Sequence, residues 1–302
     1  MESKISLFVL AAGMGSRYGG LKQMEGFGPN GETIIDYSIY DAVKAGFDKV
    51  VFVIRPDMEE DFKDVFMKKY EKKIDIQYVF QSLDMVPDWY TVHPERVKPL
   101  GTGHALLMGK GVIKGPFLVI NGDDFYGSHS FKISADFLRN ECNEQQYGIT
   151  AFRLEKVLSD HGTVTRGICE VKDGYLEKID ETFKIAKGES GEITGENSNG
   201  EKIFLKDTDL ASMNVFCLHS SVFENLEEKF HSFLKMSEDK LEGEFLLPVM
   251  LSEMIKNGEV SFKVLEAQDE WFGVTNPEDG PVVRKKIADL IENSVYPSKL
   301  EL

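Results

Sequence analysis

The sequence contains few residues of the kinds that build metal centres and disulfide frameworks. Its three cysteines, Cys142, Cys169 and Cys217, are scattered without paired spacing, and its six histidines show no ligand spacing. This scarcity argues against a zinc site and favours a reducing compartment, so we expect a cytoplasmic protein.

Long apolar runs are also missing. No run approaches the ~20 residues that a membrane-spanning helix needs. The apolar stretch at residues 5–10 is short and continues into a glycine-rich segment. We interpret it as a strand and not as a signal peptide, and we expect no association with a membrane.

Basic residues are in the minority. The 302 residues include 35 Lys and Arg against 51 Asp and Glu, a net charge of −16. Such a surface repels nucleic-acid backbones, which argues against a general nucleic-acid binder. A nucleotide ligand fits this composition only if the few cations gather at the site and a divalent metal supplies the remaining charge.

A glycine-rich turn with two cations follows the first apolar stretch. Gly13 and Gly15 let backbone N–H groups approach an anion without a Cβ in the way. Arg17 offers a bidentate fork for phosphate oxygens, and Lys22 offers a point charge. The segment therefore predicts a phosphate-binding loop; a structural glycine turn with incidental charges is the alternative.

Two better-known phosphate loops do not match this segment. A dinucleotide-binding turn needs a third glycine where Tyr18 stands, and an acidic residue after the second strand, which here ends in Arg55. A P-loop needs lysine where Leu21 stands, and Ser or Thr after Lys22.

The first half of the chain alternates between strands and helices. We expect strands at 5–10, 50–54, 74–80 and 117–120, and helices at 34–45, 57–70 and 102–110. This alternation of strands and helices predicts an α/β fold with a doubly wound, mixed and mostly parallel sheet. Ligands of such sheets lie at the carboxyl ends of the strands. The glycine-rich loop and the pair Asp123 and Asp124 both fall at such ends.

The second half is less regular and predicts an antiparallel elaboration. We expect strands at 149–154, 167–171, 175–179, 210–218 and 261–265, helices at 222–235 and 244–256, and a helical end after Asn276. Residues 186–201, rich in Gly, Ser, Glu and Asn, are interpreted as a loop. We expect one domain over 1–302, made of two halves at 1–128 and 129–302.

Asp123 and Asp124 are candidate magnesium ligands. They follow an apolar strand beside Gly122, where a carboxylate can hold Mg²⁺ between phosphate oxygens. Asn-Gly-Asp-Asp is also good turn chemistry, so an ordinary turn is the alternative.

The glycine-rich loop resembles the signature of the sugar-phosphate nucleotidyltransferases. The matching residues read Leu-Ala-Ala-Gly-Met-Gly-Ser-Arg, followed by Lys22, with Leu21 in place of the usual proline. The resemblance implies a Rossmann-like nucleotidyltransferase fold. It also implies that the loop binds the triphosphate of a nucleotide through Ala11, Ala12, Gly13 and Gly15.

Two further segments extend the resemblance on the nucleotide side. Residues 121–127 resemble the metal segment of the family, which implies that Asp123 is the ligand and that Gly122 contacts the nucleotide. Gln81, Gly101 and Thr102 match positions that contact the base, although Gly103 replaces a usual alanine. Thr102 also suits a helix N-cap, and His104 is interpreted as a structural histidine. Residues 82–100 are additional to the family pattern, and we expect them to form a lid or an oligomer contact.

Other segments match the sugar-phosphate side of the family. The resemblance therefore implies a nucleotide-binding half at 1–128 and a sugar-phosphate-binding half at 129–302. Gly167 and Glu177 would contact the sugar, Lys178 would approach its phosphate, and Asn214 would be a sugar contact. The alternatives are an exposed strand with ordinary surface charges for Glu177 and Lys178, and a satisfied core amide for Asn214.

The second metal position departs from the family pattern. Many relatives have an aspartate where Gly273 stands, whereas N-acetylglucosamine-1-phosphate uridylyltransferases have a Gly-Val-Asn-Asn stretch, of which the first Asn is the ligand. Thr275 occupies that place here, and Asn276, the next residue, is our candidate metal ligand. Asn276 is equally suited to cap the helix that begins at Pro277.

The resemblance implies an enzyme that joins a nucleoside triphosphate to a sugar 1-phosphate with Mg²⁺ as cofactor. Its catalytic residues would be Arg17, Lys22, Asp123 and Lys178. Alternatives are a cytidylyltransferase for phosphocholine-type alcohol phosphates, a molybdenum-cofactor nucleotidyltransferase, and a catalytically silent nucleotide-sensing module. We expect no nucleic-acid partner. The base, the sugar and the oligomeric state, a homo-oligomer included, stay open.

Overall fold

The computed structural model describes residues 4–13, 26–159, 162–188, 190–238, 240–273 and 279–301. The predictions for Gly15, Arg17, Lys22, Thr275 and Asn276 lie outside these ranges.

The N-terminal half forms four parallel strands with helical crossovers, as the sequence predicts. Its elements are β1 (Ser6–Leu10), α1 (Ile34–Lys44), β2 (Lys49–Ile54), β3 (Asp75–Phe80), α4 (Thr102–Leu107) and β4 (Pro116–Asn121). The helical stretch between β2 and β3 is divided into η2 (Pro56–Met58), α2 (Glu59–Phe62), a π-helical turn η3 (Lys63–Met67) and α3 (Lys68–Tyr70). The strands lie in the order β4-β1-β2-β3.

The C-terminal half continues the same sheet. Its elements are β5 (Asp124–Phe125), α5 (Ser128–Asn140), β6 (Gln146–Arg153), η4 (Leu154–Lys156), β7 (Val164–Lys172), β8 (Tyr175–Lys187), β9 (Ile193–Glu196), β10 (Lys202–Leu205), β11 (Leu210–His219), α6 (Val222–Met236), α7 (Leu247–Lys256), β12 (Ser261–Ala267), β13 (Phe272–Gly273) and α8 (Gly280–Glu292). Strand β11 runs antiparallel to β4 and β6, and β12 runs parallel to β6. The mixed α/β fold is therefore confirmed. The division into halves at residue 128 stays a prediction.

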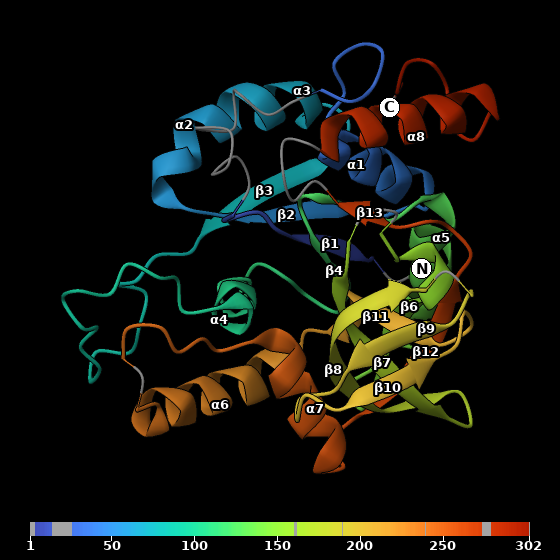
Figure 1. The fold of residues 1–302 in the computed structure, drawn as a ribbon. Coiled ribbons are helices and arrows are strands. Elements are labelled where there is room, and N and C mark those ends of the chain that lie inside the picture. The colour runs from blue at the N-terminus through green and yellow to red at the C-terminus, as the bar shows by residue number, and fades with distance from the viewer. Residues whose placement is uncertain are drawn as a thin grey trace.

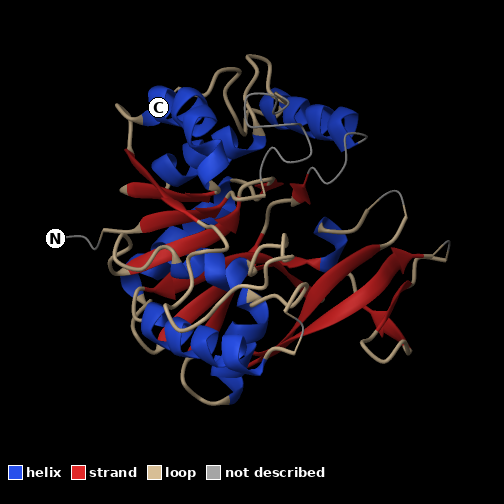
Figure 2. Ribbon diagram, turned by 90° about the vertical axis from the view of Figure 1, so that its left-hand side faces the viewer, coloured by secondary structure: helices blue, strands red, loops and turns tan. Residues whose placement is uncertain are grey.

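Helices cover both faces of the sheet (Figure 1). On one face α1, α2 and α5 bury Ile35, Phe62 and Phe131 against the strands, and on the other α6 and α7 bury Phe230 and Met250. Helix α8 packs on α1 through a smaller apolar cluster. The antiparallel strands β7 to β10 project from one side of this layered body (Figures 1 and 2). Within the described ranges, every helix is too short or too polar to cross a membrane.

Two parts of the second half differ from the sequence prediction. The predicted loop at 186–201 is wrong, because β8 continues to Lys187 and is followed by β9 and β10 in antiparallel hairpins. Ile185 and Ile193 are fully buried there and supply the apolar contacts that the polar composition obscures. Helix α5 was not predicted, although Phe131, Ala135 and Leu138 form a buried face at helical spacing.

Candidate functional site

The carboxyl ends of β1 to β4 form one edge. Leu10 pairs with Val53 of β2 and with Asn121 of β4, while Ile54 pairs with Phe80 of β3. The residues that follow these strands are therefore neighbours. We call them the sheet-edge site: Ala11, Ala12, Gly13, Arg55, Gln81, Gly122 and Asp123.

Backbone hydrogen bonds continue past the strand ends and fix this edge. The Ala11 amide donates to Val53 O at 3.0 Å, and the Gly122 amide donates to Leu10 O at 3.0 Å. Arg55 Nη1 donates to Ala12 O at 2.8 Å, and its Nε and Nη2 hold both carboxylate oxygens of Asp57 at 3.0 and 3.1 Å. Arg55 thus positions the start of the glycine-rich loop. We did not predict this role, because nothing local in the sequence connects Arg55 to Ala12.

Gln81 is a buried amide at the end of β3. Its backbone amide donates to Ile54 O at 2.8 Å. Its side-chain Nε2 lies 3.0 Å from Gly101 O and 3.3 Å from His104 Nδ1. The structure therefore brings together Gln81 and Gly101, two of the predicted base contacts. His104 of α4 lies beside them.

The turn at Gly101, Thr102 and Gly103 is held by Phe245 from the segment before α7. Phe245 N donates to Leu100 O, and Gly103 N donates to Phe245 O, both at 2.8 Å. Gly101 has φ +103°, and a Cβ there would lie 2.5 Å from Phe245 O. Only glycine combines that left-handed backbone with so close an approach.

Thr102 caps a different helix from the one we predicted. The N-cap of α4 is Gly101, and the Thr102 hydroxyl accepts a hydrogen bond from Leu247 N, at the start of α7, at 3.0 Å. A polar side chain beside the first free amides of a neighbouring helix satisfies them as a local cap would. Its predicted contact with the nucleotide stays a prediction.

Gly103→Ala is expected to destabilise the protein by about 1–3 kcal/mol, the usual cost of overpacking. The new Cβ would lie 2.6 Å from Phe245 Cδ1. Chemical denaturation should show this loss, and Phe245→Leu should recover part of it in the double variant. Equal stability of Gly103→Ala and wild type would contradict the described packing.

The 82–100 segment is fastened to the loop after α6 by Arg96. This buried guanidinium donates to four carbonyl oxygens: Lys98 O at 2.8 Å, Pro99 O at 2.9 Å, Lys240 O at 3.2 Å and Gly243 O at 2.7 Å. Trp89 packs edge-on against His231 of α6 and lies under Lys235 Nζ. The segment is thus docked on the body of the protein; whether it acts as a lid or an oligomer contact stays open.

Arg96→Ala is expected to lower stability by about 2–3 kcal/mol, because four partly buried carbonyls lose a charged donor. Urea unfolding measures the loss, and limited proteolysis should cut 82–100 faster. Arg153→Ala is the matched control, since Arg153 makes an exposed ion pair with Glu266 and should change stability by no more than ~0.5 kcal/mol. Identical cleavage of Arg96→Ala and wild type would contradict the fastening role.

The acid pair lies where β4 ends. Asp123 is half-buried and Asp124 is buried. Asp124 Oδ2 accepts from Asn121 Nδ2 at 3.0 Å and from the Tyr126 hydroxyl at 3.2 Å. Burial, with Asp123 beside it, raises the pKa of Asp124 to about 7. Asp123 is therefore the more accessible carboxylate of the two.

Asp124 also explains the glycine at 273. Strand β13 pairs with β5 so that Gly273 lies opposite Asp124. A Cβ at 273 would lie 2.5 Å from Asp124 Oδ1. The carboxylate of Asp124 thus occupies the space that any side chain at 273 would need.

The side chains at this edge suit Mg²⁺ better than a metal ion whose ligands all come from the protein. Among the described residues, no three His, Cys, Asp or Glu side chains gather closely enough to hold a metal ion. Mg²⁺ is commonly bound through one or two carboxylates, with substrate phosphates and water completing its shell. Asp123, at the edge beside the glycine-rich loop, fits that mode, whereas Asn276 lies outside the described ranges.

Asn214 and Gly167 lie on strands next to the edge. Asn214 has φ +61° within an irregularity of β11 between Ser212 and Phe216. The preceding carbonyl, Met213 O, lies 3.3 Å from the Tyr126 hydroxyl, which also contacts Asp124. Gly167 of β7 pairs with Ser212. The structure thus brings both predicted sugar contacts near the acid pair.

Glu177 and Lys178 lie farther out, on the projecting strand β8. Lys178 pairs across to Glu170, three residues along β7 from Gly167, or roughly 10 Å. Its ammonium lies 3.2 Å from Glu170 Oε2 and 2.9 Å from Asp180 Oδ2. The register of β7 and β8 shifts between Glu170 and Val171, opposite Glu177, and both Glu177 and Lys178 are exposed. To reach a phosphate, Lys178 would have to leave two carboxylates, to which exposed lysines bind weakly.

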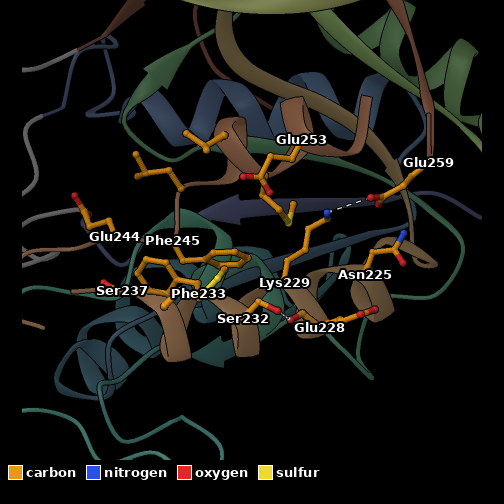
Figure 3. A pocket seen from close by; sticks show the side chains of 14 residues that line it. Asn225, Glu228, Lys229, Ser232, Phe233, Ser237, Glu244, Phe245, Glu253 and Glu259 are labelled. Carbon is orange, nitrogen blue, oxygen red and sulfur yellow. Dashed lines mark hydrogen bonds and ion pairs between the residues drawn. The ribbon is translucent and has the colours of Figure 1, made fainter. Parts of the chain in front are cut away.

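A groove of about 610 Å³ lies on the far side of the Gly101–Gly103 turn, between α6 and α7. Figure 3 shows the rings of Phe233 and Phe245 together in it, with the ion pair between Lys229 and Glu259, 3.2 Å long, beside them. Of the predicted site residues that the structure describes, none lines it. Its connection with the sheet-edge site is Phe245, whose backbone holds Gly103.

Comparison with known proteins agrees with this architecture. The sequence of "Bifunctional protein GlmU" from Methanococcus maripaludis is 26% identical over 224 residues, covering 70% of this chain and 43% of that protein. The protein of the same name from Methanococcus vannielii is 29% identical over 234 residues, covering 74% and 45%. The chain thus spans less than half the length of these relatives.

Two solved structures share the fold. The inositol-1-phosphate CTP transferase from T. maritima superposes with a TM-score of 0.61 at 15% identity, covering 97% of this chain and 98% of that one. A putative glucose-1-phosphate thymidylyltransferase from Bacillus anthracis, in complex with a sucrose, has a TM-score of 0.60 at 13% identity, covering 94% and 96%. Residues 8–289 match the sequence profile described as nucleotidyl transferase. Because that match covers almost the whole chain, the protein belongs to the nucleotidyl transferase family of enzymes.

Proposed function

We propose that this protein joins a nucleoside triphosphate to a sugar 1-phosphate and releases pyrophosphate. The observation that carries the proposal is the register of β1 and β4. In that register, the start of the glycine-rich loop and Asp123 follow the ends of two adjacent strands. Backbone amides that can approach an anion then lie beside a carboxylate that can hold its counter-ion.

The reaction needs positioning and charge neutralisation more than covalent chemistry. A phosphate oxygen of the sugar 1-phosphate attacks the α-phosphorus in line, the new P–O bond forms, and the bond to pyrophosphate breaks. The acceptor is already an anion, so no enzyme-bound intermediate is required. The task of the chain is to bring two anions together and to stabilise charge on the bridging oxygen.

Each predicted residue has a role in that task. Arg17 would hold the β- and γ-phosphates, and Lys22 the α-phosphate or pyrophosphate. Asp123 would hold Mg²⁺, which when bound neutralises phosphate charge. Lys178 would contact the sugar phosphate after it leaves Glu170 and Asp180.

A pyrophosphate-release screen tests the proposal. Four nucleoside triphosphates are combined with sugar 1-phosphates and with alcohol phosphates, such as phosphocholine and inositol 1-phosphate, in the presence of Mg²⁺. Release with a sugar 1-phosphate supports the proposal, and release with alcohol phosphates alone would move the acceptor to that class. Nucleotide binding without release would favour the sensing module, and neither binding nor release would contradict the nucleotide site.

A further inference from the structure

A chain of buried hydrogen bonds runs from the 82–100 segment to Gln81. His104 Nε2 lies 2.8 Å from Met85 O, and His104 Nδ1 lies 3.3 Å from Gln81 Nε2. Gln81 Nε2 also lies 3.0 Å from Gly101 O. The chain connects Met85 O, the imidazole, the Gln81 amide and Gly101 O in that order.

The acceptors at both ends decide where every proton lies. Gly101 O and Met85 O can only accept, so Gln81 must present its NH₂ to Gly101, and His104 must carry its proton on Nε2. His104 Nδ1 is then an acceptor for the second N–H of Gln81. Both amide hydrogens of Gln81 are used, and among the described residues no hydrogen bond reaches its Oε1. This oxygen is also not among the fully buried atoms without a partner, so it is not sealed from solvent.

The surroundings of His104 favour the neutral ring that this arrangement requires. The imidazole is fully buried and stacks on Phe230 of α6, with ring centroids 4.9 Å apart. Among the described residues, Arg96 of the 82–100 segment is the charged group that acts on His104. The side chain that α6 presents to His104 is the apolar ring of Phe230. Burial, together with Arg96, lowers the pKa of His104 below its ordinary value of 6.5.

We propose that His104 is the positioning residue that fixes the amide of Gln81, so that this site accepts a nucleobase whose edge donates an N–H to Gln81 Oε1. The inference rests on the proposed function. It gives the otherwise structural histidine a part in base choice, through Gln81 rather than by contact with substrate. A protonated or Nδ1–H imidazole would point a hydrogen at the Gln81 NH₂ and release the amide to rotate.

Three substitutions at position 104 separate this role from simple packing. His104→Asn places Oδ1 near the former Nδ1 and keeps an acceptor for Gln81. His104→Gln keeps a donor near Met85 O but loses that acceptor, and His104→Phe keeps only the ring. We expect His104→Gln and His104→Phe to raise the KM for the nucleoside triphosphate about tenfold, with a smaller change in kcat, as the loss of one hydrogen bond implies. His104→Asn should stay near wild type.

A methylated nucleotide tests the atom that Gln81 presents. Two substrates are compared: the nucleoside triphosphate with the highest activity in the screen, and its analogue in which the N–H of the Watson–Crick edge is methylated. Wild type should reject the analogue by about 10²-fold or more in kcat/KM, since the acceptor would be left unpaired. That rejection should shrink in His104→Phe and persist in His104→Asn. Equal rejection in all four proteins would overturn the proposal.

Nitrogen-15 NMR of the histidine rings gives a readout that does not depend on activity. His104, assigned by its loss in His104→Asn, should show the neutral Nε2–H tautomer at pH 6.5. A folded pKa below the unfolded value means that the unfolded state binds the proton first as pH falls. Wild type should therefore lose stability relative to His104→Asn below about pH 6.5 and not above it. An Nδ1–H tautomer, or a charged ring at pH 6.5, would overturn the proposal.

The inference can fail without the proposed function failing. If no triphosphate releases pyrophosphate, the reaction is wrong, and the NMR result still reports on the hydrogen-bond chain. If release occurs but the position-104 variants keep the wild-type KM and rejection, the reaction stands and the role of His104 is wrong.

Discussion

Asp123→Ala is expected to lower the rate of pyrophosphate release by about 10²–10³-fold, the cost of removing one electrostatic contact with a transition state. Asp123 is the more accessible of two carboxylates at the end of β4 and lies beside the first residues of the glycine-rich loop. In the proposed reaction, this variant would lack the carboxylate that holds Mg²⁺ against the phosphates. Steady-state assays with saturating substrates measure the loss in kcat.

Two comparisons make the Asp123 result specific. Asp136→Ala removes an exposed carboxylate of α5 and should keep wild-type turnover. Asp123→Asn keeps the shape of the side chain and should lose nearly as much activity as Asp123→Ala, together with a higher Mg²⁺ requirement. Turnover of Asp123→Ala within twofold of wild type would show that this carboxylate is not the metal ligand.

Arg17→Ala should have an effect of similar size, about 10²–10³-fold in turnover, because its fork would hold the β- and γ-phosphates as charge moves onto pyrophosphate. Arg17 lies outside the described residues, so this prediction rests on the sequence. Pyrophosphorolysis of the corresponding NDP-sugar is the most direct assay, since pyrophosphate is then a substrate.

Arg17→Lys separates charge from geometry. A lysine keeps the charge but cannot form the bidentate contact, so we expect it to recover only part of the activity. Arg153→Ala, which removes an exposed guanidinium paired with Glu266, is the control and should be fully active. Full pyrophosphorolysis by Arg17→Ala would contradict the role of the loop.

The sheet edge could be predicted because its determinants are local. Strands β1, β2 and β4 are short buried runs and β3 is a half-buried one. Parallel strands with helical crossovers have their carboxyl ends on one side. The positions of Gln81, Gly122 and Asp123 follow from that rule. The same local argument fails for residues 186–201, where the polar composition conceals the buried Ile193.

The contacts that could not be predicted join distant parts of the chain. Position 103 has no room for a side chain, because the ring of Phe245 fills the space that a Cβ would need. Thr102 caps α7 and not its own helix, and Arg96 binds carbonyls of the loop after α6. No periodicity or turn signal in one segment reports such partners. The sequence therefore indicated Thr102 and Gly103 but not their partners, and it did not indicate Arg96.

The central claim is that one edge of the sheet binds both the polyphosphate and its metal. The direct test is a crystal structure with Mn²⁺ and the nucleoside triphosphate selected by the screen, with the metal located by anomalous scattering. We predict the metal on the carboxylate of Asp123 and the polyphosphate against the backbone that begins at Ala11. A polyphosphate bound elsewhere, such as the groove between α6 and α7, with no metal at Asp123, would contradict the account.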